Sequence, residues 1–211
     1  VRALQPALQK LELVDDTSGK RHAMQRTRDE GLFEVTLKAD RDSLHYHFEG
    51  VSYEGDPARF ADPYQTEPTL SDFDLYLLGE GTHLDAYEKL GAHLITANGM
   101  NGVRFAVWAP NARRISVVGD FNRWDARVHP MRQIRNGIWE LFIPGLGEGL
   151  IYKYDILSHV NDYRIQKADP YGFYTEVRPK TASIVYPLDR YQWNDADWMA
   201  NREEHNGLKA P

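Results

Sequence analysis

Hydrophobic residues in this chain mostly recur with a period of two in short runs, which is the pattern of half-buried β-strands. Within 150–156, Ile151 and Lys153 fall on one face of the predicted strand and Tyr152 and Tyr154 on the other. Other runs rich in β-branched and aromatic residues predict further strands over 105–108, 115–118, 138–143, 163–165 and 182–186. Short strands at this spacing predict a β-sandwich.

The order of these runs repeats once along the chain. Five segments of the N-terminal part match later segments in the same order, at offsets between 102 and 107 residues. The matched pairs begin at Val1 and Val103, Leu11 and Ile115, Gly31 and Gly137, Tyr46 and Tyr152, and Ala61 and Ala168. Five matches in register predict two tandem copies of one domain, with a period too long for a solenoid.

The pattern changes to helical spacing between the two copies. Residues 70–79 predict a helix with Ser71 as its N-cap and Gly79 or Gly81 at its end. The expected apolar stripe of this helix consists of Phe73, Tyr76 and Leu77. A second short helix is predicted over 84–90. We interpret both helices as a packed connector, because each stripe needs an apolar surface to bury.

We therefore predict an all-β chain of two tandem immunoglobulin-like β-sandwiches, joined by a short helical connector and followed by a linker. The predicted parts are an N-terminal sandwich over 1–66, a connector over 67–98, a second sandwich over 99–187 and a linker over 188–211. Because the chain opens on valine inside a strand pattern, we expect the first strand to be truncated at its start.

Four of the five tryptophans are expected to pack. Trp108 and Trp139 lie inside apolar strand patterns, so we expect both in the core. Trp193 and Trp198 lie in the linker, where a solvated ring would be costly. They either fold back onto the second sandwich or dock on a part that follows.

Composition excludes several classes of function. The chain has 31 acidic and 25 basic residues and a net charge of −6, which argues against a nucleic-acid partner. It has no apolar run of about 18 residues or more, so we expect no membrane span. The chain contains no cysteine, which excludes disulfides and thiolate metal sites and is typical of a reducing compartment. We expect a cytoplasmic protein.

Few side chains are placed for catalysis. Glu34 and Glu140 occupy matched strand positions in separate copies, so we expect structural cross-strand roles rather than the facing carboxylates of a glycosidase. His45 and His47 could approach a metal from one strand face, but no third ligand is evident. Nucleophile-elbow, phosphate-loop and zinc-helix motifs are missing. We therefore expect no catalytic residue, no metal and no cofactor.

The stretch 117–125 differs from the other strands because it ends in a turn that carries a tryptophan. Gly119 and Asp120 are turn residues, and they leave Trp124 at the edge of the sheet. Such a ring either packs back as a plug or stays open as a platform for the apolar face of a sugar ring. We favour the platform, because Phe121 is better placed to be the plug.

Several motifs resemble those of the bacterial 1,4-α-glucan (glycogen) branching enzymes. They are found at 78–83, 87–93, 105–114, 117–125, 137–144 and 168–171. Together they cover about residues 78–186, a region that resembles a glycogen-binding module of the family-48 carbohydrate-binding type. Residues 1–65 resemble the N-terminal β-domain of long-form branching enzymes.

The resemblance assigns candidate binding residues by position. The platform tryptophan of the family falls on Trp124, and the lysine of its Tyr-Lys-Tyr strand falls on Lys153, which could donate to sugar hydroxyls. Asn122 is a further candidate donor. Gln166 stands where relatives carry a second ring, and the nearest aromatic residue is Tyr163. With one ring in place of two, we expect weak binding, and we expect no equivalent site in the first copy.

The resemblance implies a non-catalytic N-terminal part of a branching enzyme. This part would bind or position α-1,4-glucan, such as glycogen or malto-oligosaccharides, for transfer to 6-hydroxyls. Its second partner would be an α-amylase-type catalytic barrel of the same polypeptide, beyond the linker, and the chain alone is expected to be inactive. The alternative is a structural scaffold that packs on the barrel or on another protein without binding sugar.

Overall fold

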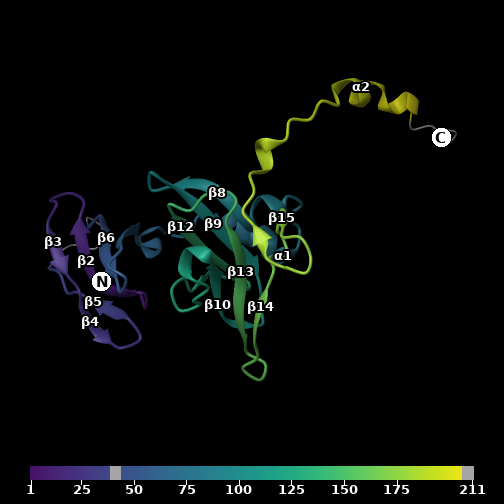
Figure 1. Ribbon diagram of the computed structural model, residues 1–211. Helices are drawn as coiled ribbons and strands as arrows, with labels where there is room; N and C mark the ends of the chain where they lie inside the picture. The colour runs from purple at the N-terminus through teal and green to yellow at the C-terminus, as the bar shows by residue number, and fades with distance from the viewer. Residues whose placement is uncertain (39–43, 206–211) are drawn as a thin grey trace.

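The computed structural model describes residues 1–38 and 44–205 and consists mainly of β-strands (Figure 1). The strands form small antiparallel sheets in two successive β-domains, with few helices. The all-β prediction is confirmed at this level. The finer prediction of tandem immunoglobulin-like sandwiches stays a prediction.

The first β-domain has two antiparallel sheets that share one small core. Its sheets have the strand orders β1-β5-β4 and β3-β2-β6-β7. The strands are β1 (Arg2–Leu4), β2 (Leu8–Asp15), β3 (Arg21–Ala23), β4 (Gln25–Arg28), β5 (Leu32–Glu34), β6 (Tyr46–Ser52) and β7 (Pro57–Ala61). Leu13, Phe33 and Phe48 come from both sheets and are buried between them.

The second β-domain is larger and is built in the same way. One sheet has the order β11-β12-β9-β8, and the other has the order β10-β13-β16-β15 with β14 also on β13. The strands are β8 (Gly91–Ala97), β9 (Met100–Trp108), β10 (Ala112–Gly119), β11 (Arg132–Gln133), β12 (Ile138–Pro144), β13 (Ile151–Ser158), β14 (Arg164–Lys167), β15 (Tyr174–Thr175) and β16 (Ser183–Ile184). Phe105, Ile115, Leu141 and Tyr154 from the two sheets meet in the core.

The predicted duplication is visible in the strand pairing. In the first domain β5 lies between β1 and β4 and β6 lies between β2 and β7, and in the second domain β12 and β13 take the corresponding central places. The aspartate of the matched Asp-Pro motif accepts hydrogen bonds from tyrosine hydroxyls in both copies. Asp62 accepts the Tyr46 hydroxyl at 2.7 Å, and Asp169 accepts the hydroxyls of Tyr152 and Tyr154 at 2.7 and 2.8 Å. Each buried carboxylate thus finds partners on the neighbouring central strand.

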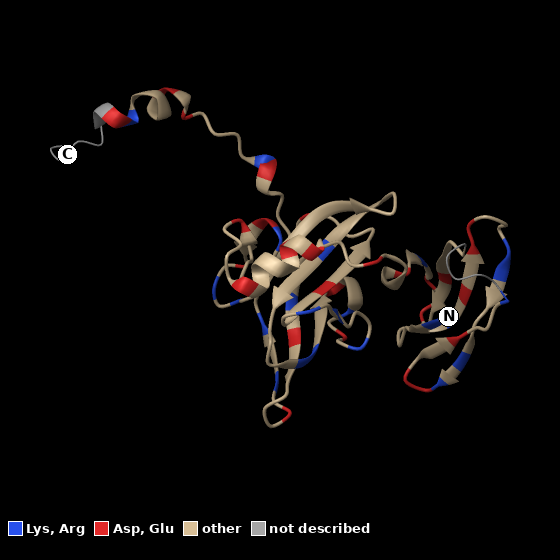
Figure 2. Ribbon diagram, turned by 180° about the vertical axis from the view of Figure 1, so that it is seen from behind, with Lys and Arg blue, Asp and Glu red and all other residues tan. Residues whose placement is uncertain are grey.

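The connector contains the predicted helix, α1 (Asp72–Glu80), with a Ser71 capping box and a left-handed Gly81 at its C-terminus. The predicted buried stripe is wrong, because Phe73 and Tyr76 are 68% and 57% exposed. Leu75 is the buried residue, since α1 lies across the outer face of the sheet that contains β9 and β12 (Figure 2). Helical spacing alone could not identify which side of α1 is buried, because that side is set by the position of the sheet.

The second predicted helix is only a 3-10 turn, η3 (Ala86–Glu88). The chain then enters β8, which pairs antiparallel with β9. Part of the range expected for the connector therefore extends the second domain. The segments η2 (Pro63–Gln65) before the connector and η4 (Asp120–Asn122) after β10 are also 3-10 turns.

The two matched glutamates have structural roles. Glu34 lies directly opposite Arg2 on the neighbouring strand and forms an ion pair with it at 2.6 Å, as predicted. Glu140 is buried and holds the connector, because it accepts hydrogen bonds from the backbone N–H of Thr69 at 2.6 Å and of Leu70 at 3.3 Å.

The tryptophans divide between core and surface. Trp139 is buried in the core, as predicted. The prediction for Trp108 is wrong: its ring is 58% exposed at the end of β9, where it falls on the outer face of the sheet. Trp193 and Trp198 are 78% and 55% exposed. They do not fold back, because the segment with η5 (Leu188–Arg190) and α2 (Ala196–His205) leads away from the second domain (Figure 1).

The two β-domains contact each other around η2. The Tyr64 hydroxyl donates to the carbonyl of Pro130 at 2.8 Å. The guanidinium of Arg132 donates to the carbonyls of Tyr64 and Thr66, both at 2.6 Å. Among the described residues, none of the helices is long and apolar enough to cross a membrane.

Candidate carbohydrate-binding face

The candidate site lies on the outer face of the sheet formed by β10, β13, β14 and β16. The alternation in β13 fixes this face, because Tyr152 and Tyr154 point into the core and Lys153 lies on the opposite side. Val118 on β10 lies directly opposite Lys153. Its side chain is fully buried even though it belongs to the outer face.

Trp124 lies in the turn that follows β10. Its backbone N–H donates to the carbonyl of Gly119 at 2.9 Å, and the indole N–H donates to the Asp120 carboxylate at 2.7 Å. The ring is half-buried, so part of its surface remains accessible. Phe121 packs on the core, with its ring stacked 6.3 Å from that of Phe105. The turn therefore directs one ring inward and holds the other at the surface.

Lys153 lies beside this turn with its ammonium group already ordered. The Nζ atom donates to the hydroxyl oxygen of Thr181 at 2.9 Å. Thr181 was not singled out in the sequence, although it precedes a predicted strand. It reaches Lys153 because β16 pairs with the start of β13.

Asn122 is buried inside the turn. Its amide nitrogen donates to the carbonyl of Val117 at 2.8 Å and contacts Nδ1 of His129 at 3.0 Å, while its oxygen accepts the Gly119 N–H at 3.0 Å. Both amide hydrogens are thus engaged within the protein. The structure does not offer Asn122 as an open donor, and its role in sugar binding stays a prediction.

Tyr163 is not brought to Trp124. It is 59% exposed in the turn between β13 and β14, and its carbonyl accepts the N–H of Ser158 at 2.8 Å. Ser158 and Lys153 are five residues apart on β13, which corresponds to about 17 Å. The pairing of β10 with β13 places Lys153 opposite Val118, just before the turn that carries Trp124, whereas Tyr163 lies at the far end of β13.

A charged group extends the outer face beyond Lys153. Asp155 is buried, and Arg164 on β14 donates to its two carboxylate oxygens at 2.9 and 3.2 Å. The hydrogen bond to this carboxylate raises the pKa of Arg164. Gln166, at the position where a second ring was considered, lies opposite Asp155 and is exposed. This part of the face offers polar donors in place of a ring.

The corresponding face of the first domain is closed by polar contacts. His47 takes the place of Lys153, and its ring nitrogens lie 2.6 Å from Asp16 and 3.2 Å from Glu49. The turn after β2 is stabilised by the Asp15 carboxylate and carries no aromatic ring. Within the described ranges no cluster of three or more potential metal ligands is found, so the two-histidine pattern gains no third ligand there.

A partly accessible indole and an ordered ammonium group are both suited to binding a sugar, through stacking and through hydrogen bonds to hydroxyls. Comparison with known families agrees. Residues 89–172 match the family of carbohydrate-binding module 48 (isoamylase N-terminal domain), and residues 1–64 match the N-terminal domain of alpha-1,4-glucan branching enzyme. The second β-domain is thus a carbohydrate-binding module.

Curated relatives place both domains in one kind of protein. The chain is 51% identical over 89% of its length to the 1,4-alpha-glucan branching enzyme of Paramagnetospirillum magneticum. It is 46% identical over its whole length to that of Synechocystis. It covers 25% and 27% of these two relatives. The chain belongs to the N-terminal region of the glycogen branching enzyme family. A solved pullulanase from Anoxybacillus, at 15% identity and a TM-score of 0.42 over 87% of this chain and 25% of that chain, is too distant to bear on function.

Proposed function

We propose that this chain holds α-1,4-glucan on its second β-domain and presents it for branching, in which a chain segment is transferred to a 6-hydroxyl. The observation that supports this most directly is the accessible part of the Trp124 ring, fixed by Asp120, next to the outer face that carries Lys153. The indole would stack on the apolar face of a glucose unit, and Lys153 and Thr181 would serve its hydroxyls. In this proposal the chemistry belongs to a catalytic barrel of the same polypeptide.

The site is suited to weak binding. One aromatic stack contributes on the order of 1 kcal/mol beyond the area it buries. Association costs several kcal/mol. We therefore expect maltoheptaose to bind with a Kd of about 0.1–10 mM.

Calorimetry with maltoheptaose on Trp124→Ala tests the proposal. The variant should lose measurable binding, because it removes the stacking surface. Trp108→Ala is the control, since Trp108 is also at the surface, and is the more exposed of the two, but lies on the opposite sheet of the same domain. If Trp124→Ala binds as the unmodified chain does, the site lies elsewhere.

The alternative proposal is a scaffold without sugar binding. The exposed apolar face of α1, with Phe73 and Tyr76, favours it, because such a face suits packing against another domain. Native gel electrophoresis with and without glycogen distinguishes the two proposals. A scaffold should migrate in native gels at the same rate with and without glycogen, whereas a glucan-binding domain should be retarded.

A further inference from the structure

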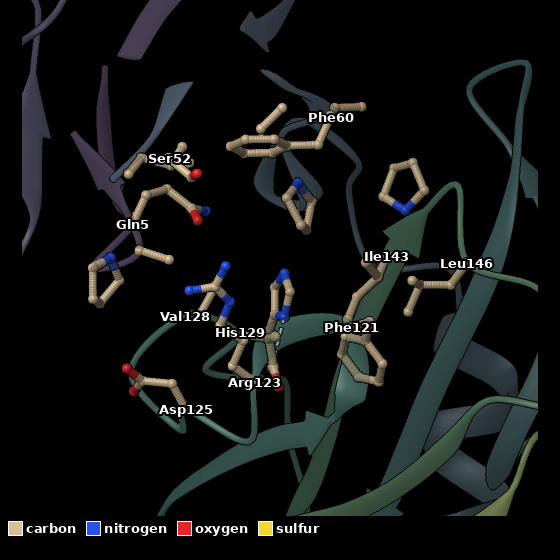
Figure 3. A pocket seen from close by; sticks show the side chains of 18 of the residues that line it. Gln5, Ser52, Phe60, Phe121, Arg123, Asp125, Val128, His129, Ile143 and Leu146 are labelled. Atoms are coloured by element: carbon tan, nitrogen blue, oxygen red, sulfur yellow. Dashed lines mark hydrogen bonds between the residues drawn. The ribbon is translucent and has the colours of Figure 1, made fainter. Parts of the chain in front are cut away.

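A cleft of about 570 Å³ separates the two β-domains on the side of η4 (Figure 3). This volume lies within the range of about 300–1,000 Å³ that is typical of sites for small ligands. Its walls come from both domains: Gln5, Ser52 and Phe60 belong to the first, and Phe121 and His129 to the second. The Trp124 face is a different surface, since Trp124 does not line the cleft.

Aromatic and aliphatic groups form the floor and roof of this cleft. Figure 3 shows the Phe60 ring on one side of the cleft and Phe121 with Ile143 on the other. Phe60 and Phe121 are both half-buried, so each ring keeps accessible surface. Ring faces of this kind accept the C–H surface of a sugar.

Polar groups from both domains point into the same space. The His129 ring accepts a hydrogen bond at Nδ1 from the Asn122 amide at 3.0 Å, and its other nitrogen is directed toward the opening in Figure 3. Burial lowers the pKa of His129 to about 4, so the ring is neutral near pH 7 and its proton is on Nε2. The Gln5 amide and the Arg123 guanidinium face the same opening. The cleft thus presents N–H donors between apolar walls.

The charges around the cleft favour a neutral ligand. Arg123 is the only lysine or arginine among the described lining residues, and Asp56 and Asp125 also line the cleft. Hydrogen bonds from its own backbone and from Ser52 lower the pKa of Glu54, and the charge of Arg123 adds to this effect. With Asp125 paired to Arg127 and Asp56 present beside Arg123, the lining of the cleft carries no net positive charge that would attract a phosphate.

We propose that the cleft between the two β-domains is a second oligosaccharide site, where a short neutral α-glucan lies between Phe60 and Phe121 and accepts hydrogen bonds from His129, Gln5 and Arg123. The choice of α-glucan among neutral sugars rests on the proposed function. The backbone of the turn also connects the two sites. Arg123, which faces the cleft, and Trp124, which faces the sheet, are consecutive residues with φ of +54° and +59°.

The test is a titration of the ¹⁵N-labelled chain with maltotriose, followed by amide chemical shifts. Two separate groups of amides should shift: a platform group around Trp124 and Lys153, and a cleft group at Gln5, Ala58 and Phe60. Gln5→Ala with Phe60→Leu should weaken binding at the cleft group by about tenfold and leave the platform group unchanged. Gln5→Ala alone repeats the test if the double variant fails to fold.

Trp124→Ala separates this inference from the proposed function. It should abolish the shifts of the platform group, while the amides of the first domain continue to shift. The inference is overturned if the cleft group never shifts, or if its shifts disappear in Trp124→Ala, because they would then report the platform site. A titration with inorganic phosphate checks the ligand class: shifts of the cleft group with phosphate and not with maltotriose would also overturn it. Shifts at the cleft with none at the platform would contradict the proposed function alone.

Discussion

Single residues in the turn after β10 are fixed by backbone geometry. Arg123 and Trp124 both adopt the left-handed region, which side chains other than glycine enter at a cost of about 1 kcal/mol each. The Trp124 N–H bond to Gly119 and the three contacts of Asn122 hold this conformation. We interpret Asn122 as the residue that keeps the turn in shape, which places Trp124 on the sheet.

His129 should make the stability of the second domain depend on pH. Its folded-state pKa is about 4, below its ordinary value of 6.5, because burial disfavours the charged ring. Between these two pH values the unfolded chain therefore binds more protons than the folded chain. The contribution of His129 to the free energy of unfolding is fully present above pH 6.5, and the free energy of unfolding falls by about 3 kcal/mol as the pH drops to 4. Burial also lowers the pKa of His93, which acts in the same direction.

Urea unfolding at pH 7 and pH 4.5 measures this effect. All five tryptophans lie at or beyond Trp108, so indole fluorescence reports on the second domain and the segment after it. His129→Gln keeps an acceptor for Asn122 and should remove most of the difference between the two pH values. If the free energy of unfolding of the variant changes just as much between pH 7 and pH 4.5, the pH dependence comes from His93 or from the carboxylates and not from His129.

At the scale of elements, one buried carboxylate attaches the connector to the second domain. Glu140 on β12 accepts three hydrogen bonds from the segment before α1, two from Thr69 and one from Leu70. Leu70, Leu75 and Leu90 then cover the outer face of that sheet. The position of α1 therefore depends on the hydrogen bonds of Glu140 and on the burial of Leu75, and not on the apolar stripe predicted from helical spacing.

Glu140→Gln should destabilise this attachment by about 2–3 kcal/mol, because the amide keeps only one acceptor oxygen and turns its NH₂ group toward a buried donor of Thr69 or Leu70. Amide hydrogen exchange should accelerate at Thr69 and Leu70. Glu34→Gln is the matched control from the other copy, since its ion pair with Arg2 is partly exposed and such pairs contribute about 0–1 kcal/mol. Equal changes in local exchange for the two variants would contradict the anchoring role of Glu140.

At the scale of the whole molecule, the arrangement of the domains depends on a small polar contact. Arg132 binds two carbonyls of the segment after β7, and Tyr64 reaches Pro130. Small polar interfaces between domains permit relative motion by default. These hydrogen bonds, together with the packing of Tyr64 on the core of the second domain, hold the two walls of the cleft in place.

Arg132→Ala with Tyr64→Phe should loosen the two domains without unfolding either. Residual dipolar couplings should fit one alignment tensor in the unmodified chain and require two in the variant. Arg127→Ala is the control, because Arg127 bonds to Asp125 within its own loop. A single tensor for the double variant would show that other contacts hold the domains.

The sequence by itself determined the strands, the duplication and the chemistry of the turn. Alternation in β13 identified the faces of Tyr152 and Lys153, because a strand has only two sides. The five matched segments revealed the repeat, and the capping signals of Ser71 and Gly81 placed α1. These are local properties, decided by neighbours along the chain.

Tertiary structure decided which surfaces meet. Trp108 and the stripe of α1 were assigned to the wrong environment, because the face that each presents depends on a sheet formed by distant residues. Thr181 reaches Lys153 only through the pairing of β16 with β13, and Tyr163 is kept away by the length of the same strand. The cleft has walls from residues more than a hundred positions apart, as Gln5 and His129 are. The periodicity of a sequence reports only on neighbours along the chain. It does not predict this cleft, because the cleft forms where two separately folded cores pack against each other.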